Sequence, residues 1–168
     1  NGATGFVYSG LGPDFRQVVA KCRKYAVAYE KKYQEMQPTR LVVKDAASVM
    51  QDATQSGGVR PFGISILVAG YDEVNGPQLF QVDPSGTYFQ WKATAIGKNQ
   101  VNAKNFLEKR YKDDMEVEDA VHTALLTMRE GFEGEMNENN IQVGVVKGDM
   151  KFRIFSAREV KDYLDEAS

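Results

Sequence analysis

The sequence predicts an α+β fold in which two antiparallel sheets face each other and helices cover both outer faces, giving a four-layer αββα sandwich. Three observations predict it. Two long helical patterns precede a run of short strands, tight turns join those strands without a parallel crossover, and further helices with a strand pair follow. Packed in layers, these elements bury their apolar faces in one domain spanning residues 1–168.

The first third of the chain predicts one strand and two helices. Residues 6–9 are strand-like and end at a glycine-rich turn, and Pro13 follows where the first turn of a helix tolerates proline. Apolar residues then recur at three- and four-residue spacing, which predicts a helix over residues 13–36. After a break, a second helix is expected over residues 39–55 and ends at Gly57-Gly58.

The middle third predicts an antiparallel meander. Asn75-Gly76 lies between two strand-like runs and is typical of a hairpin turn. Asp83-Pro84-Ser85-Gly86 has the residues of a type I turn, with proline in second place and glycine in fourth. The expected strands are residues 62–69, 78–82, 87–91 and 93–96.

The last third returns to helices and then ends in a strand pair and a further helix. The expected elements are helices from residue 101 and over residues 117–128, a polar loop at 134–140, and strands at 141–146 and 152–155. The acidic start of the second of these helices suits the positive end of the helix dipole. Ser156 and Glu159 match the Ser-x-x-Glu pattern of a capping box, which opens the final helix.

Composition and charge exclude several classes of protein. The 168 residues are 42% apolar and 26% charged, as in ordinary globular proteins. A net charge of −2 without a clustered basic stripe does not favour nucleic-acid binding, and no apolar run is long enough to cross a membrane. The single cysteine, Cys22, cannot form an internal disulfide, so we expect a reducing intracellular compartment. Because the chain begins at Asn1, close to a strand, we expect a fragment with an incomplete N-terminal part.

Three features resemble reactive or ligand-binding sites, and each has a simpler explanation. Gly10-Leu11-Gly12 lies between a strand and a helix, but Phe15 stands where a phosphate loop has its third glycine and Pro13 removes a backbone donor. His122, the one histidine, has no obvious nucleophile as a partner, so we expect it at a helix surface or layer boundary. Cys22 lies on an apolar helix face, where a buried and unreactive thiol is the default.

Carboxylates and tyrosines also gather along the chain. The carboxylates are Asp113, Asp114, Glu116, Glu118 and Asp119 at a helix start, and Glu133, Glu135 and Glu138 in a polar loop. Their spacing is not that of a calcium loop, so solvent exposure explains them. Tyr25, Tyr29 and Tyr33 recur every four residues, which is typical of a helix in a core or at a subunit interface. These residues therefore nominate no catalytic, cofactor-binding or metal-binding site.

Residues 54–63, Thr-Gln-Ser-Gly-Gly-Val-Arg-Pro-Phe-Gly, are the most informative stretch of the chain. They occur in one order with the segments 7–14, 47–51, 83–86, 91–99, 105–111, 118–124 and 159–164. Together these segments resemble the alpha-type subunits of the 20S proteasome core particle, and within them the type-2 group. Arg60-Pro61-Phe62-Gly63 and Gly97-Lys98-Asn99 favour the alpha class over the beta class.

The resemblance implies the αββα fold of N-terminal-nucleophile hydrolases without their catalysis. In active relatives a processed N-terminal threonine attacks the peptide bond. This chain begins Asn1-Gly2, and Gly97-Lys98-Asn99 replaces a Gly-Ser-Gly stretch of active relatives. The family's N-terminal helix and first strands are absent from this sequence, together with the lysine that anchors regulator tails, so no gate or regulator-pocket residue is assigned.

The resemblance further implies a non-catalytic subunit of a threonine-type endopeptidase complex in the cytoplasm and nucleus. It would take part in alpha-ring assembly, substrate gating and activator docking in ubiquitin-dependent protein degradation. Expected partners are other alpha subunits, beta subunits, and a regulatory particle or activators, with no cofactor, nucleic acid or membrane. The helices at 13–36 and 39–55 would face the beta subunits. The alternative is an active N-terminal-nucleophile amidohydrolase whose nucleophile lies upstream, and a nucleotide-binding module is a third possibility.

Overall fold

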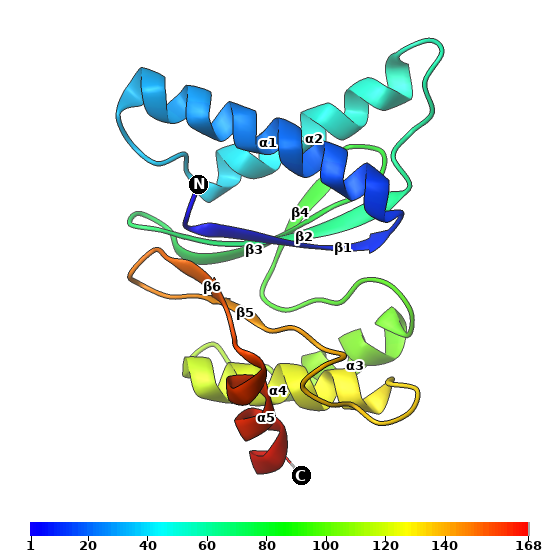
Figure 1. Cartoon of the computed structure of the whole chain (residues 1–168), viewed down its shortest axis with the longest axis vertical. Helices are drawn as coiled ribbons and strands as arrows, with labels where there is room; N and C mark the ends of the chain where they lie inside the picture. Colours follow the sequence, from blue (N-terminus) through cyan, green and yellow to red (C-terminus); the bar gives the residue numbers. More distant parts are fainter. Residues whose placement is uncertain (168) are drawn as a thin grey trace.

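The computed structural model describes residues 1–167 and arranges them in stacked layers of helices and antiparallel sheets (Figure 1). The strands are β1 (Thr4–Gly10), β2 (Ile64–Asp72), β3 (Gly76–Val82), β4 (Tyr88–Trp91), β5 (Gly144–Val146) and β6 (Phe152–Ile154). The helices are α1 (Gly12–Tyr33), α2 (Thr39–Gln55), α3 (Gln100–Arg110), α4 (Val117–Glu130) and α5 (Ala157–Glu166). Helices α1 and α2 cover one face of the larger sheet, and β5, β6 and the later helices lie on its other side.

The larger sheet has the strand order β1-β2-β3-β4, with each neighbouring pair antiparallel. Along β2 the buried and half-buried residues alternate, because successive side chains point to opposite faces. Ile64, Ile66 and Val68 are fully buried and pack in one cluster with residues of α1 and α2. The main hydrophobic core therefore lies between the sheet and this helix pair.

Close contacts fix the helix pair on the sheet. A Cβ atom added to Gly70 on β2 would lie 2.1 Å from Oγ1 of Thr39, so the start of α2 sits directly on a strand position that must lack a side chain. Helix α1 ends where Gln34 adopts the left-handed conformation (φ 56°) and its N–H donates to the carbonyl of Glu30. This turn lets the chain reverse into α2.

A second, smaller core holds the other half of the molecule together. Its buried residues are Val121 and Leu125 of α4, Phe155 after β6, and Val160 of α5. The Ser156 hydroxyl accepts from the Glu159 N–H while the Glu159 carboxylate accepts from the Ser156 N–H, which forms the predicted capping box at the start of α5.

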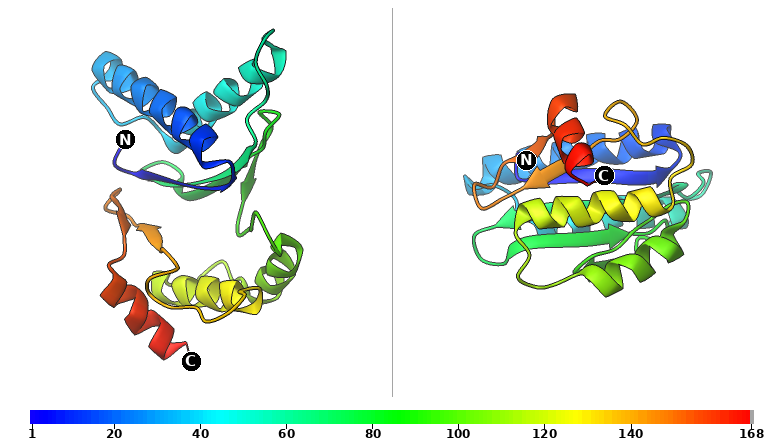
Figure 2. Two further views of the ribbon diagram at one scale, coloured as in Figure 1. Left: turned by 45° about the vertical axis from the view of Figure 1, so that its right-hand side comes forward. Right: turned by 90° about the horizontal axis from the view of Figure 1, so that it is seen from below.

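The two halves meet where β5 and β6 lie against the larger sheet. Figure 2 shows the chain passing from β4 to α3 along one side of the molecule, while β5 and β6 occupy the other side. There the Phe152 ring covers Gly5 of β1: a Cβ atom on Gly5 would lie 2.0 Å from a ring carbon. The Phe152 N–H also donates to the carbonyl of Gly2 at 2.7 Å. We call this contact between Gly5 and Phe152 the seam.

The predicted fold class is confirmed, and the predicted bounds of α2 are those of the structure. The strand predicted at 93–96 is wrong: the chain leaves the sheet after Trp91, and Gly97 (φ +88°) packs against Ser9 in an irregular connection. Alternating residues suit a strand, but here no neighbouring strand is available for pairing. Helix α1 also ends at Tyr33 rather than at residue 36, and β5 begins at Gly144 rather than at 141.

Candidate interaction surface

The glycine-rich turn before α1 is explained by backbone packing. Gly10 has a φ of +122°, and a Cβ atom there would lie 2.1 Å from the carbonyl oxygen of Gly63. The Leu11 N–H donates to that same oxygen at 3.1 Å. The pattern Gly10-Leu11-Gly12 therefore reflects the close approach of two chain segments and requires no phosphate.

Asp14 and Arg60 form a two-bond ion pair at the start of α1. The two terminal guanidinium nitrogens donate to the two carboxylate oxygens at 2.7 and 2.9 Å, and the Gly63 N–H donates to Oδ2 at 2.9 Å. The guanidinium first, and then the Gly63 N–H, holds the pKa of the Asp14 carboxyl below its ordinary value. This Asp14–Arg60 clamp ties the 57–63 segment to α1, a pairing of residues 46 positions apart that the sequence analysis missed.

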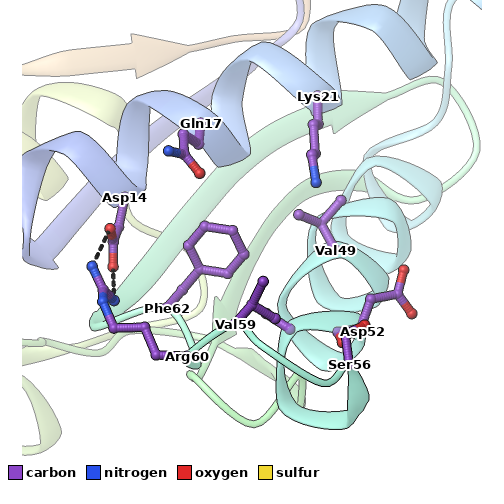
Figure 3. A pocket seen from close by; sticks show the side chains of 10 residues that line it. Asp14, Gln17, Lys21, Val49, Asp52, Ser56, Val59, Arg60 and Phe62 are labelled. Carbon is purple, nitrogen blue, oxygen red and sulfur yellow. Dashed lines mark hydrogen bonds and ion pairs between the residues drawn. The ribbon is translucent and has the colours of Figure 1, made fainter.

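A groove of about 450 Å³ lies beside the clamp, between α1 and α2. Figure 3 shows Gln17 and Lys21 of α1 on one side, Val49 and Asp52 of α2 on the other, and the Phe62 ring between them. The lining combines apolar side chains with the Asp14–Arg60 clamp, and Lys21 and Asp52 lie on opposite walls. It holds no paired nucleophile and base, so its chemistry suits contact with another molecule better than catalysis.

Cys22 and His122, the two most reactive side-chain types, lie in different parts of the molecule. His122 of α4 places Nε2 3.2 Å from a Glu166 carboxylate oxygen and contacts the Tyr163 ring edge to face, so it joins α4 to α5. Cys22 is 6% exposed among the residues of the main core. Burial, with a smaller contribution from Asp45, raises the pKa of its thiol to about 12. Neither side chain has the partners of a nucleophilic site.

The carboxylates singled out in the sequence are dispersed over the surface. Asp113 accepts from Lys92 at 2.7 Å, and Glu133 accepts from Lys98 at 2.5 Å. Within residues 1–167 no three His, Cys, Asp or Glu side chains come close enough together to hold a metal ion. That the chain works without a metal or cofactor stays a prediction. Of the helices described, none is both long and apolar enough to span a membrane.

Several large apolar side chains of α1 lie at the surface. Tyr25, Val27 and Tyr33 are 46%, 52% and 52% exposed, so two of the three predicted tyrosines lie at the surface and not in this chain's own core. Tyr29 is half-buried, its ring lies tilted against that of Tyr33 with 4.5 Å between the ring centres, and its hydroxyl donates to Glu35. Apolar side chains are thus left uncovered on one helix.

The same helix is strongly basic. Its cations are Arg16, Lys21, Arg23, Lys24, Lys31 and Lys32, against the two acids Asp14 and Glu30. Because Asp14 is held by Arg60, most of this positive charge is not neutralised within the described chain. At 3.6 residues per turn these cations spread over about half of the helix circumference, so they make the surface of α1 broadly basic without forming a narrow stripe. We call this basic and aromatic surface the α1 face.

The sequence is similar to known proteins along nearly its whole length. The family model described as "Proteasome subunit" matches residues 1–146. Proteasome subunit alpha type-2 of Oryza sativa subsp. indica is 59% identical over 162 residues, covering 96% of this chain and 68% of that protein. Proteasome subunit alpha type-2-A of Arabidopsis thaliana shows the same identity and coverage, and the type-2 subunit of Dictyostelium discoideum is 55% identical over 160 residues, covering 95% of this chain and 68% of that protein.

Proposed function

The chain belongs to the proteasome subunit family, and we propose that it acts as a non-catalytic alpha-type subunit of the proteasome core particle, of the type-2 group. The observation that carries this proposal is the high identity to type-2 alpha subunits along nearly the whole chain. At such identity, relatives share the fold and the surfaces by which a subunit joins its complex. A separate enzymatic role would need reactive groups brought together, whereas Cys22 is buried in the main core and His122 pairs with Glu166 at the surface of the other half.

The α1 face supports a role in assembly. Half-exposed apolar side chains such as Val27 and Tyr33 are costly in a lone protein, and a subunit interface covers them. The surrounding cations favour a neighbour with carboxylates at its surface and speed the encounter with it. The mechanism is geometric: related subunits that bury such faces close a ring, and ring closure fixes the entrance to an inner chamber.

The finer proposal covers partners, chemistry and location. Other alpha subunits are the ring neighbours, beta subunits form the adjoining ring, and a regulatory particle or activators dock on the outer side. The peptide bonds are cut by threonine-type subunits elsewhere in the complex, in ubiquitin-dependent protein degradation in the cytoplasm and nucleus. This chain contributes ring assembly, control of substrate entry and activator docking.

The test is incorporation into the core particle. The full-length protein, tagged at its C-terminus and expressed in cells, should migrate with the core particle on native gels, and the purified protein alone should not cleave a fluorogenic peptide. Cleavage by the isolated protein, abolished by a hydroxyl-directed covalent inhibitor, would favour the amidohydrolase alternative. A tagged protein that remained monomeric in cells would refute the assembly proposal.

A matched pair of variants tests the α1 face itself. Val27 on α1 and Val101 on α3 are exposed valines on helices, at 52% and 66%. Val27→Asp should reduce incorporation by about tenfold or more, because it removes an apolar contact and places a carboxylate against the acidic neighbour that the cations favour. Val101→Asp introduces the same charge and should incorporate as the unaltered protein does. Equal incorporation of the two variants would show that the α1 face is not the docking surface.

A further inference from the structure

The tip of the β2–β3 hairpin is an exposed turn organised by a single carboxylate. Oδ1 of Asp72 accepts from the backbone N–H of Val74 at 3.2 Å and of Asn75 at 2.7 Å. It also accepts from the side-chain Nδ2 of Asn75 at 3.0 Å. Val74 is 90% exposed and Asn75 is exposed beside it. Solvent therefore reaches the Asn75 amide freely, and its described side-chain contact lies within the turn.

Gly76 follows directly and leaves the chain open at this point. Its φ of +68° is the left-handed conformation that the residue closing a three-residue hairpin loop adopts, with Gly76 paired to Asp72. No heavy atom beyond its chain neighbours lies within 4 Å of the position a Cβ atom would take. Gly76 thus has no side chain to hinder its backbone nitrogen, and water can reach the neighbouring side-chain amide carbon of Asn75.

We propose that Asn75 is a self-modification site, at which the folded chain converts an amide into a carboxylate. The backbone nitrogen of Gly76 attacks Cγ of Asn75, forming an N–C bond and losing its proton to water. The Cγ–Nδ2 bond breaks, and the amide leaves as ammonia after taking up a proton. Water then adds to either carbonyl of the five-membered succinimide, and ring opening gives aspartate or isoaspartate. In total, one amide and one water yield one carboxylic acid and one ammonia, without oxidant or reductant.

The product changes the turn that holds it. Nδ2 of Asn75 is a donor to Asp72, and a carboxylate in its place is an acceptor facing another acceptor. Together with Asp72 and Glu73, the new carboxylate would place three negative charges at one hairpin tip. The net charge of the chain would change from −2 to −3. Isoaspartate also adds one carbon to the backbone between β2 and β3. Both products loosen the pairing of Asp72 with Gly76.

A second Asn-Gly pair in the chain is an internal comparison. The Asn1 amide is held at both of its ends: Nδ2 donates to the Gln37 carbonyl at 2.6 Å and Oδ1 accepts from the Ala3 N–H at 3.0 Å. The first of these contacts reaches a segment far along the chain, so the amide cannot turn without breaking a tertiary contact. Asn1 should therefore convert more slowly than Asn75, although the residue that follows is glycine in both cases.

The experiment follows the folded full-length protein over weeks in mildly alkaline buffer, with peptide mass mapping at each asparagine and enzymatic methyl labelling of isoaspartate. Asn75 should convert several-fold faster than Asn1 and than each asparagine not followed by glycine. The Asn75→Gln variant, whose longer side chain disfavours the five-membered ring, should lack the main acidic species seen on isoelectric focusing.

Two results would overturn the proposal. One is an intact Asn75 in the folded protein over a period in which the same protein in urea converts it, because the turn would then protect the amide. The other is an acidic species that persists unchanged in Asn75→Gln, because its source would then lie elsewhere. The Asn75→Asp variant gives a further readout: amide hydrogen exchange should be faster at Asp72 and Gly76 and unchanged at the far end of β2.

Discussion

The seam between Gly5 and Phe152 gives a sharp test of how the two halves of the molecule are joined. Gly5 is buried in β1, and a Cβ atom there would lie 2.0, 2.1 and 2.4 Å from three carbons of the Phe152 ring. These separations are far shorter than any van der Waals contact. In the Gly5→Ala variant the ring must therefore move out of its place between the layers.

The expected cost combines two opposed effects. Overpacking a well-filled site typically lowers the free energy of unfolding by about 1–3 kcal/mol, whereas replacing glycine by alanine within a strand raises it by about 0.5–1 kcal/mol. A net loss of about 1 kcal/mol follows for Gly5→Ala, which lowers the Tm of a chain of this size by roughly 2–4 °C. Gly2→Ala is the matched control, because nothing lies within 4 Å of its Cβ position and its effect should stay within about 0.5 kcal/mol.

A double-mutant cycle measured by urea unfolding separates the seam from other effects. In a Phe152→Ala background the ring is gone, so Gly5→Ala should change sign and stabilise by about 0.5–1 kcal/mol. The coupling energy between the two positions is then about 1–3 kcal/mol. If Gly5→Ala cost the same with and without the ring, the reasoning would be refuted, because the ring would not be what fills the space above Gly5.

Three further outcomes test other parts of the structure. Ile66→Ala removes a side chain that is 0% exposed and should lower the free energy of unfolding by about 2–5 kcal/mol. Val74→Ala, at the 90% exposed hairpin tip, should change it by less than about 0.5 kcal/mol. Urea unfolding midpoints of the two variants measure the difference. Because folding lowers the pKa of Asp14, its charged form stabilises the fold above the ordinary value of 3.8 and this contribution is lost as pH falls through the lower folded value. The stability gap between the unaltered protein and Asp14→Asn should thus narrow in acid, as thermal melts across pH would detect. The Cys22 thiol, with its pKa raised to about 12, should resist a thiol-specific reagent at neutral pH until urea unfolds the chain; rapid labelling of the folded protein would contradict its burial.

Local sequence signals predicted the elements whose causes are local. The hairpin at Asn75-Gly76, the capping box of Ser156 and Glu159, and the full extent of α2 each depend on residues a few positions apart. The strand expected at 93–96 failed because alternation describes which way side chains point and not whether a partner strand lies alongside. Whether a strand finds a partner depends on the whole sheet, so the sequence of one segment does not predict it.

The contacts that shape the candidate surface come from residues distant in sequence. The pairing of β1 with β2 brings Asp14 to Arg60, and the Phe152 ring reaches Gly5 from the far end of the chain. Each residue alone looks ordinary: an acid in a first helical turn, an arginine before proline, a glycine in a strand.

The presence of two unequal cores has a consequence for how the molecule opens. The cluster that includes Met50 and Ile66 is large and crossed by the longest strand pairings, whereas the cluster around Leu125 and Phe155 is small and depends on short elements. Opening free energies within one protein follow such differences in buried contact. Amide protons of α5 and β6 should therefore exchange first, as one cooperative unit, while those at the centre of β2 report global unfolding. Limited proteolysis of this partly open state would cut near the C-terminus and leave a folded fragment that contains α1, α2 and the larger sheet.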